Sequence, residues 1–191
     1  MAKFFGNLHL VLLVGLVAAV AVALQFGAAV TIDGRSVLSW LHVFFGILWI
    51  GLLYYLNFVQ VPTMPAIPAE QKGAITGHIA PKVFFFFRYA ALLTVITGLI
   101  VAKLTGYAER ALVFNGATPN ENLIGLGMWL ALIMAFNVWF IIWPAQKKIL
   151  GIVEATDEAK AKAAPLALAA SRTNLLLSLP MLYCMASANM G

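Results

Sequence analysis

Cysteine and charge are both scarce in this chain. Cys184 is the one cysteine among 191 residues, so no disulfide can form within the chain. A c-type haem attached through two cysteines and a zinc site built on several cysteines are excluded for the same reason. Charged residues make up 10% of the sequence, against about a quarter in a typical soluble domain. With 63% hydrophobic residues, this composition is typical of an integral membrane protein.

Acidic residues are fewer than basic residues. Seven acidic residues stand against twelve basic ones, which gives a net charge of +5. A basic excess can indicate nucleic-acid binding, but here the charges lie beside long apolar runs. Orientation in a bilayer is therefore the better explanation, and we expect no nucleic-acid partner.

Long apolar runs predict about five transmembrane helices, because a spanning helix needs roughly 20 mainly apolar residues. The predicted spans are residues 8–30, 37–61, 83–105, 122–143 and 173–190. Residues 145–172 are rich in Ala, Lys and Glu, and they predict a cytoplasmic helical connector on the membrane surface. We therefore predict an all-α integral membrane helical bundle, with residues 1–191 forming a single membrane domain.

The distribution of basic residues predicts the orientation of this bundle. The N-terminus and the second and fourth loops carry eight basic residues: Lys3, Lys72, Lys82, Lys147, Lys148, Lys160, Lys162 and Arg172. The first and third loops carry three, namely Arg35, Lys103 and Arg110. Since basic loops stay in the cytoplasm, the N-terminus is predicted to be cytoplasmic and the C-terminus outside.

Polar residues lie on one face of the second predicted span. At 100° per residue, this face consists of His42, Gly46, Trp49, Leu53, Asn57 and Gln60. Polar groups in a bilayer are costly unless they face the interior of a bundle, so we expect this face to point inward. The third span carries a stripe of small residues suited to tight helix packing: Ala91, Thr94, Gly98 and Ala102.

Arg88 is a cation inside the third predicted span, after a run of four phenylalanines. It can snorkel to the headgroups, because it lies near the end of the span. Alternatively it is buried, with Asn57, Gln60 and Asn137 as nearby amides. No acidic residue lies mid-span, so an anionic ligand such as a haem propionate or a lipid phosphate would supply the missing counter-ion.

His42 lies in the outer part of the second predicted span. His9 lies on the order of 20 Å away along the membrane normal, so the two cannot ligate one haem together. His42 is either one axial haem ligand or a structural histidine that is hydrogen-bonded inside the bundle. If haem binds, we expect it to be five-coordinate or to carry a non-histidine sixth ligand, with Met181, Met185, Met190 and water as the candidates.

Four stretches, in order, resemble the urate oxidase N-terminal membrane domain family. They are "LHVFFGILWIGLLYYLNF", "FFRYAALLTVITG", "FNVWFIIWPAQKKIL" and "SRTNLLLSLPMLYCMASAN". The residues that match the family patterns are His42, Trp49, Gly51, Asn57, Arg88, Asn137, Pro144, Gln146, Arg172, Asn174 and Pro180. The second helix is also distantly similar to that of membrane protoporphyrinogen-oxidase-like and copper-resistance proteins, where such a histidine is suggested to bind haem b.

This resemblance implies a multi-pass protein of the bacterial inner membrane, linked to membrane-bound urate oxidation. Two histidines of the family pattern are replaced, by Thr173 and Asn189. The family members usually described also end in a periplasmic cytochrome c domain, whose pattern these residues do not show. Among the residues that are kept, we expect a cofactor site formed by His42, Trp49, Asn57, Arg88 and Asn137, with His42 as the ligand of haem iron.

Two functions follow from these expectations, and whether the chain is an enzyme stays open between them. The first is a membrane subunit of a larger redox or respiratory-type complex, a scaffold with a possible haem b site. The second is a short urate-oxidase-like oxidoreductase that passes electrons to a separate cytochrome. The expected partners are the lipid bilayer and either other membrane subunits or further copies of this chain. A transporter has the weakest support, because mid-membrane carboxylates are lacking.

Overall fold

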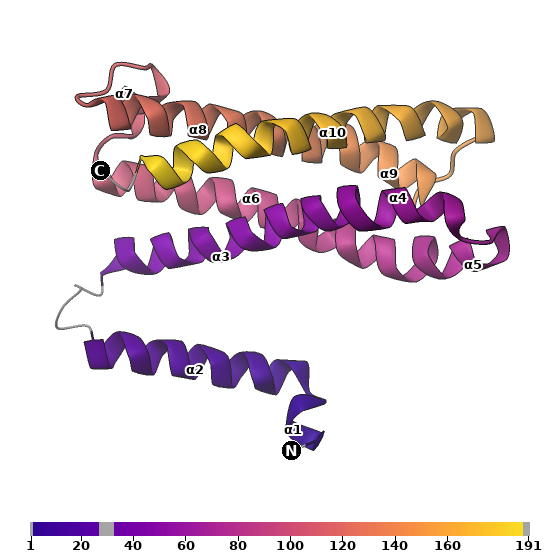
Figure 1. The fold of residues 1–191 in the computed structure, drawn as a ribbon, viewed down its shortest axis with the longest axis horizontal. Helices are drawn as coiled ribbons and strands as arrows, with labels where there is room; N and C mark the ends of the chain where they lie inside the picture. The colour runs from indigo at the N-terminus through magenta and orange to yellow at the C-terminus, as the bar shows by residue number, and fades with distance from the viewer. Residues whose placement is uncertain (1, 27–32, 189–191) are drawn as a thin grey trace. The chain divides into compact units, whose positions relative to one another are not determined.

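The structure is a computed structural model that describes residues 2–26 and 33–188. It divides into two compact units, Met1–Val37 and Leu38–Gly191. The first contains the short helix α1 (Ala2–Phe5) and the long apolar helix α2 (Leu8–Phe26). Throughout the described residues every regular element is a helix, which confirms the all-α prediction (Figure 1).

The second unit is a helical bundle (Figure 1), in which the consecutive helical elements form four long rods. The first rod contains α3 (Gly34–Tyr54), the π-helical η1 (Tyr55–Gln60), α4 (Val61–Thr63) and the 3-10 turn η2 (Met64–Ala66). The second contains α5 (Ala69–Ala74), η3 (Ile75–Ile79) and α6 (Ala80–Thr105). After α7 (Ala108–Leu112), the third contains α8 (Pro119–Phe136), η4 (Asn137–Ile142) and α9 (Trp143–Ile149). The fourth is α10 (Asp157–Ser187).

Local sequence signals mark where the long helices begin and end. Thr118 and Thr156 cap α8 and α10, each accepting a hydrogen bond from the backbone N–H three residues on. Gly106 ends α6 in the left-handed conformation, with a φ of 85°. There its N–H donates to the carbonyls of Ala102 and Lys103, which would otherwise lack partners.

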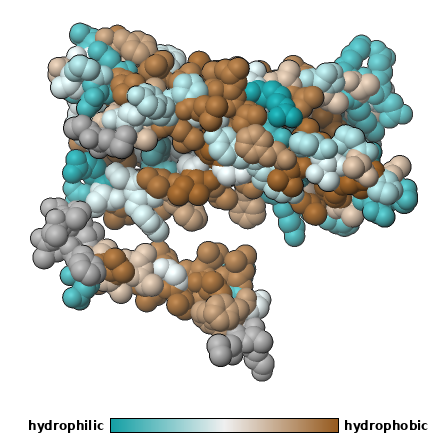
Figure 2. Space-filling view, in the orientation of Figure 1, coloured by the Kyte–Doolittle hydropathy of each residue, from teal (hydrophilic) through white to brown (hydrophobic). Residues whose placement is uncertain are grey.

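Four helical segments among the described residues are long and apolar enough to cross a membrane. They are Leu8–Gln25, Gly34–Ala66, Ala69–Thr105 and Pro119–Ile149. They contain the described parts of the first four predicted spans except Phe26; residues 27–30 of the first lie outside the described residues. The face of the bundle in Figure 2 is largely apolar between its two ends, with hydrophilic residues gathered towards the ends. These features agree with the protein class predicted from the sequence, an integral membrane helical protein.

The fifth predicted span lies in α10, which is not among these four candidates. Thr173, Asn174 and several serines lower the hydropathy of this helix. Nevertheless α10 packs along α8, η4 and α9, so it belongs to the same bundle. The predicted surface connector and the predicted fifth span share this one unbroken helix from Asp157 onward. The span count and the orientation therefore stay predictions, and residues 189–190 lie outside the described part.

The inward face of the first rod is confirmed. Trp49, Leu53 and Asn57 are buried to 1% exposure or less. Trp49 and Leu53 belong to the main hydrophobic core together with Phe87 of α6 and Met134 of α8. The small-residue stripe of α6 is confirmed as well, because Ala91, Thr94 and Ala102 are all buried. Many large apolar side chains of the bundle are exposed, among them Phe44, Phe58 and Phe140, and they are suited to contact with lipid acyl chains.

Candidate functional site

A cavity of about 860 Å³ opens between α3, α6, α8 and α10. It lies in the half of the bundle where α3 begins and α10 ends, which we call the cavity half. Its lining is mostly apolar, with His42, Ser39 and Thr94 among the few polar residues. This volume lies within the range of pockets that hold small molecules and cofactors.

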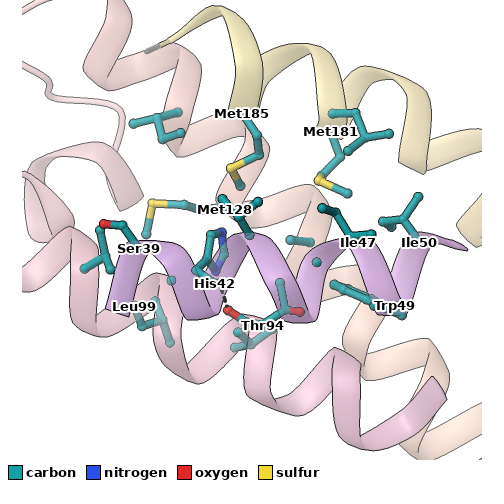
Figure 3. Close-up of a pocket in the computed structure, with 18 of the residues that line it drawn as sticks. Ser39, His42, Ile47, Trp49, Ile50, Thr94, Leu99, Met128, Met181 and Met185 are labelled. Atoms are coloured by element: carbon teal, nitrogen blue, oxygen red, sulfur yellow. Dashed lines mark hydrogen bonds between the residues drawn. The ribbon is translucent and has the colours of Figure 1, made fainter. Parts of the chain in front are cut away.

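His42 enters this cavity with one ring nitrogen already paired. Its Nδ1 lies 2.9 Å from the carbonyl oxygen of Thr94 and 3.4 Å from the hydroxyl of Thr97 (Figure 3). A carbonyl can only accept, so Nδ1 carries the hydrogen and donates it to Thr94. In the neutral ring, Nε2 then carries the lone pair, and no described residue bonds to it. This is the arrangement that orients metal-ligating histidines.

Gly98 makes room for the imidazole. A Cβ built on Gly98 would lie 2.7 Å from Cε1 and 3.0 Å from Nδ1 of His42. Any side chain at this position would therefore push the ring away from Thr94. Gly46, on α3, is less crowded, because the nearest atom to its Cβ position is Cγ2 of Thr94 at 3.9 Å.

Three methionines line the cavity with His42. Met128 comes from α8, and Met181 and Met185 come from α10. Figure 3 shows their side chains reaching into the space across from the α3–α6 contact. A thioether sulfur is a soft ligand and also packs well against a flat aromatic ring. The cavity therefore presents one imidazole nitrogen to several polarisable groups.

Trp49 lies further along α3 and also lines the cavity. Its indole N–H is buried and has no hydrogen-bond partner among the described residues. Unpaired buried donors are rare, because each costs free energy comparable to a lost hydrogen bond. Because this nitrogen has almost no accessible surface, it is closed off from the cavity as well, and only the apolar part of the Trp49 ring lines the site.

The predicted site residues do not converge on one place. His42 and Trp49 line the cavity, whereas Asn57, Arg88 and Asn137 do not. Arg88 is half-buried and lies over the ring of Trp143, with its guanidinium carbon 3.8 Å from the ring centroid. None of the three amides expected near it, at Asn57, Gln60 and Asn137, donates to it or accepts from it.

The two asparagines instead tie α10 to the rest of the bundle. Asn57 Nδ2 donates to the carbonyl of Leu53 and to the hydroxyl of Ser171, both at 2.9 Å. Asn137 Nδ2 donates to Oδ1 of Asn174 at 2.9 Å, and Asn174 donates to the carbonyl of Met134 at 3.0 Å.

Both asparagines lie in π-helical segments, which recur at functional positions in helices. A fourth hydrogen bond to α10, between the hydroxyls of Tyr54 and Ser178 at 3.1 Å, extends this contact along the helix. We call this set of residues, Tyr54, Asn57, Asn137, Ser171, Asn174 and Ser178, the polar seam.

Several of these roles were not predicted from the sequence. Thr94 and Gly98 were identified only as packing residues, since a backbone carbonyl acceptor leaves no mark in a sequence. Met128 lies in an ordinary apolar run and gave no signal. Ser178 could have been found, because it lies four residues from Asn174 on the same helix face.

The cavity, the buried polar seam and the apolar exterior define an integral membrane helical protein with a ligand-sized internal site. The family described as "Urate oxidase N-terminal" matches residues 86–191, more than half of the chain. The chain therefore belongs to the urate oxidase N-terminal family. The stretch around His42 precedes the matched residues. No curated protein and no solved structure matches the chain.

Proposed function

We propose that this chain is a membrane subunit of a larger redox or respiratory-type complex and that it holds one haem b through His42. The observation that supports this most directly is the geometry of the imidazole. Thr94 fixes the ring through Nδ1, and Nε2 is left for a ligand beside a cavity of about 860 Å³. A neutral histidine held in this way is suited to be an axial ligand.

The lining residues fit such a group. Gly98 leaves room for the imidazole, and the walls of the cavity are mostly apolar. Met128, Met181 and Met185 offer thioethers on the other side of the cavity. A bound haem would supply one-electron transfer, and the apolar surroundings and the opposite ligand would set its potential. The residues of this chain would orient the haem, shield it and ligate its iron.

A place in a complex is supported by the exposed apolar surface. Helix α2 is apolar around its whole circumference, with Leu13, Val17 and Leu24 exposed within their own unit. A helix of this kind contacts lipid or a neighbouring helix on every side. Partner subunits or further copies of this chain fit that surface.

The haem proposal is tested by purifying wild type, His42→Ala and His78→Ala from cells supplied with haem. His78 is an exposed histidine of η3 and serves as the matched control. We expect a Soret band in wild type and in His78→Ala, and its loss in His42→Ala. A colourless wild-type protein, or a Soret band unchanged in His42→Ala, contradicts the proposal.

The complex is tested by mild solubilisation of native membranes and affinity purification of this chain. We expect other membrane subunits to co-purify in a fixed ratio, together with the haem. Recovery of this chain alone, as an oligomer of identical copies, contradicts a role as one subunit of a larger complex.

Membership of the urate oxidase N-terminal family favours a second candidate function. In it, the chain is a short urate-oxidase-like oxidoreductase that passes electrons to a separate cytochrome. Urate-dependent oxygen uptake by membranes that contain the chain and an added c-type cytochrome tests this function. Uptake that requires both components and is lost in His42→Ala supports it, and the absence of uptake contradicts it.

A further inference from the structure

Arg88 is a half-buried cation without a counter-ion. Its guanidinium makes no hydrogen bond or ion pair with any residue of the described ranges 2–26 and 33–188. The ion pairs found there use the carboxylates of Glu109, Glu121, Asp157 and Glu158, each with another partner. A guanidinium has five N–H donors in one plane, so its edge is left to groups from outside the chain.

Aromatic rings hold this guanidinium in position. Its central carbon lies 3.8 Å from the ring centroid of Trp143, 5.0 Å from Tyr89 and 5.5 Å from Phe85. Trp139, one turn before Trp143, donates its indole N–H to the carbonyl of Arg88 at 3.0 Å. Stacking covers the face of the guanidinium, so an anion can bind at its N–H edge.

Arg88 lies just inside the phosphate level of a bilayer, which its long side chain can reach. Helix α6 continues for 17 residues from Arg88 to its end at Thr105. At about 1.5 Å per residue this distance is roughly 25 Å, close to the thickness of the hydrocarbon core at about 30 Å. Tryptophan and tyrosine gather at membrane interfaces, and Tyr89, Trp139 and Trp143 surround this level.

The surroundings favour a negatively charged lipid. Lys147 and Lys148 occupy the last turn of α9, and Lys147 follows Trp143 by four residues, on the same helix face. Beside the guanidinium, Phe85 and Tyr89 expose 47% and 39% of their surfaces. A soluble anion would gain nothing from these exposed rings, whereas the acyl chains of a lipid would cover them.

We infer that Arg88 and Trp143 form a binding site for the phosphate of an anionic phospholipid, with Phe85 and Tyr89 against its acyl chains. The guanidinium donates two parallel hydrogen bonds to phosphate oxygens, which a lysine cannot do. This site is separate from the cavity beside His42 and does not depend on haem.

The site is tested with delipidated protein in neutral detergent, to which phosphatidylglycerol, phosphatidylcholine or inorganic phosphate is added. Lipid retained on the protein is counted by native mass spectrometry, and the unfolding temperature is recorded in parallel. We expect phosphatidylglycerol to be retained and to raise the unfolding temperature, and inorganic phosphate to do neither. Arg88→Leu should bind phosphatidylglycerol at least about tenfold more weakly.

Arg172→Leu is the matched control, because it removes an exposed arginine of α10 and the same unit of charge. It should retain phosphatidylglycerol like wild type. Arg88→Lys keeps the charge and tests the site if Arg88→Leu does not fold; it should bind several-fold more weakly than wild type. Equal retention by wild type and either Arg88 variant overturns the inference. So does equal retention of phosphatidylcholine, or an equal effect of inorganic phosphate.

Discussion

The two halves of the bundle accommodate polar side chains in an apolar environment in different ways. In the polar seam, amides and hydroxyls from three rods bond to one another, and Asn57, Asn174 and Ser178 are at most 1% exposed. In the cavity half, one histidine bonds to a backbone carbonyl and faces an open apolar space. The comparison shows that the polar side chains of the seam stabilise helix packing by bonding to one another, whereas Nε2 of His42 has no partner among the described residues.

Breaking the seam should have the largest effect on stability. Asn174→Leu leaves the amide of Asn137 buried without its acceptor and removes one of the two hydrogen bonds to the carbonyl of Met134, which still accepts the backbone N–H of Asn137. An unsatisfied buried group costs about 1–3 kcal/mol and a lost hydrogen bond about 0.5–1.5 kcal/mol, so the free energy of unfolding should fall by about 2–4 kcal/mol. Thermal unfolding in detergent measures this, with Thr173→Leu as control, because Thr173 is exposed and bonds only within its own helix. Equal losses in both variants would show that the seam contributes nothing specific.

Crowding the cavity half should have the next largest effect. Gly98→Ala places a methyl group 2.7 Å from the His42 ring, and overpacking of this kind costs about 1–3 kcal/mol. Gly46→Ala brings the same gain in helix propensity with only ordinary contacts, and should be close to neutral. Unfolding temperatures of the two variants measure the difference. If haem binds, Gly98→Ala should also lose the Soret band while Gly46→Ala keeps it.

Replacing the methionines should change spectra more than stability. Met→Leu at 128, 181 or 185 nearly conserves volume and should cost less than about 1.5 kcal/mol each. If one thioether is the ligand opposite His42, its replacement should shift the visible spectrum and lower the reduction potential, while the other two variants resemble wild type. Three unchanged spectra would indicate a five-coordinate haem or a water ligand.

The smallest effect is expected at an exposed ion pair at the end of the cavity half. The ammonium of Lys103 bonds to Glu109 and holds the pKa of that carboxyl below its usual range. A lowered pKa means that any stabilisation is present above the usual value and is lost as the pH falls below it. Because the pair is exposed, Glu109→Gln should differ little from wild type at neutral pH. Unfolding temperatures at several pH values measure this difference, which should vanish in acid and at high salt; a large shift at neutral pH would contradict it.

The sequence by itself determined the helical membrane class, the first four apolar segments, and the inward face that carries His42, Trp49 and Asn57. These follow from composition and from periodicity, which act locally along one helix. The family was also visible in short patterns of residues, three of which fall within the matched region.

Only the tertiary structure decided which of the polar residues meet. The partners of His42, Asn57 and Arg88 lie 52, 114 and 55 positions away in the sequence, at Thr94, Ser171 and Trp143. Periodicity gives the face on which a side chain lies but not the helix that faces it. For that reason the residues of the one predicted site lie in three separate places: in the cavity, in the polar seam, and at the arginine that stacks on Trp143. The backbone carbonyl that orients His42 is visible only in the tertiary structure.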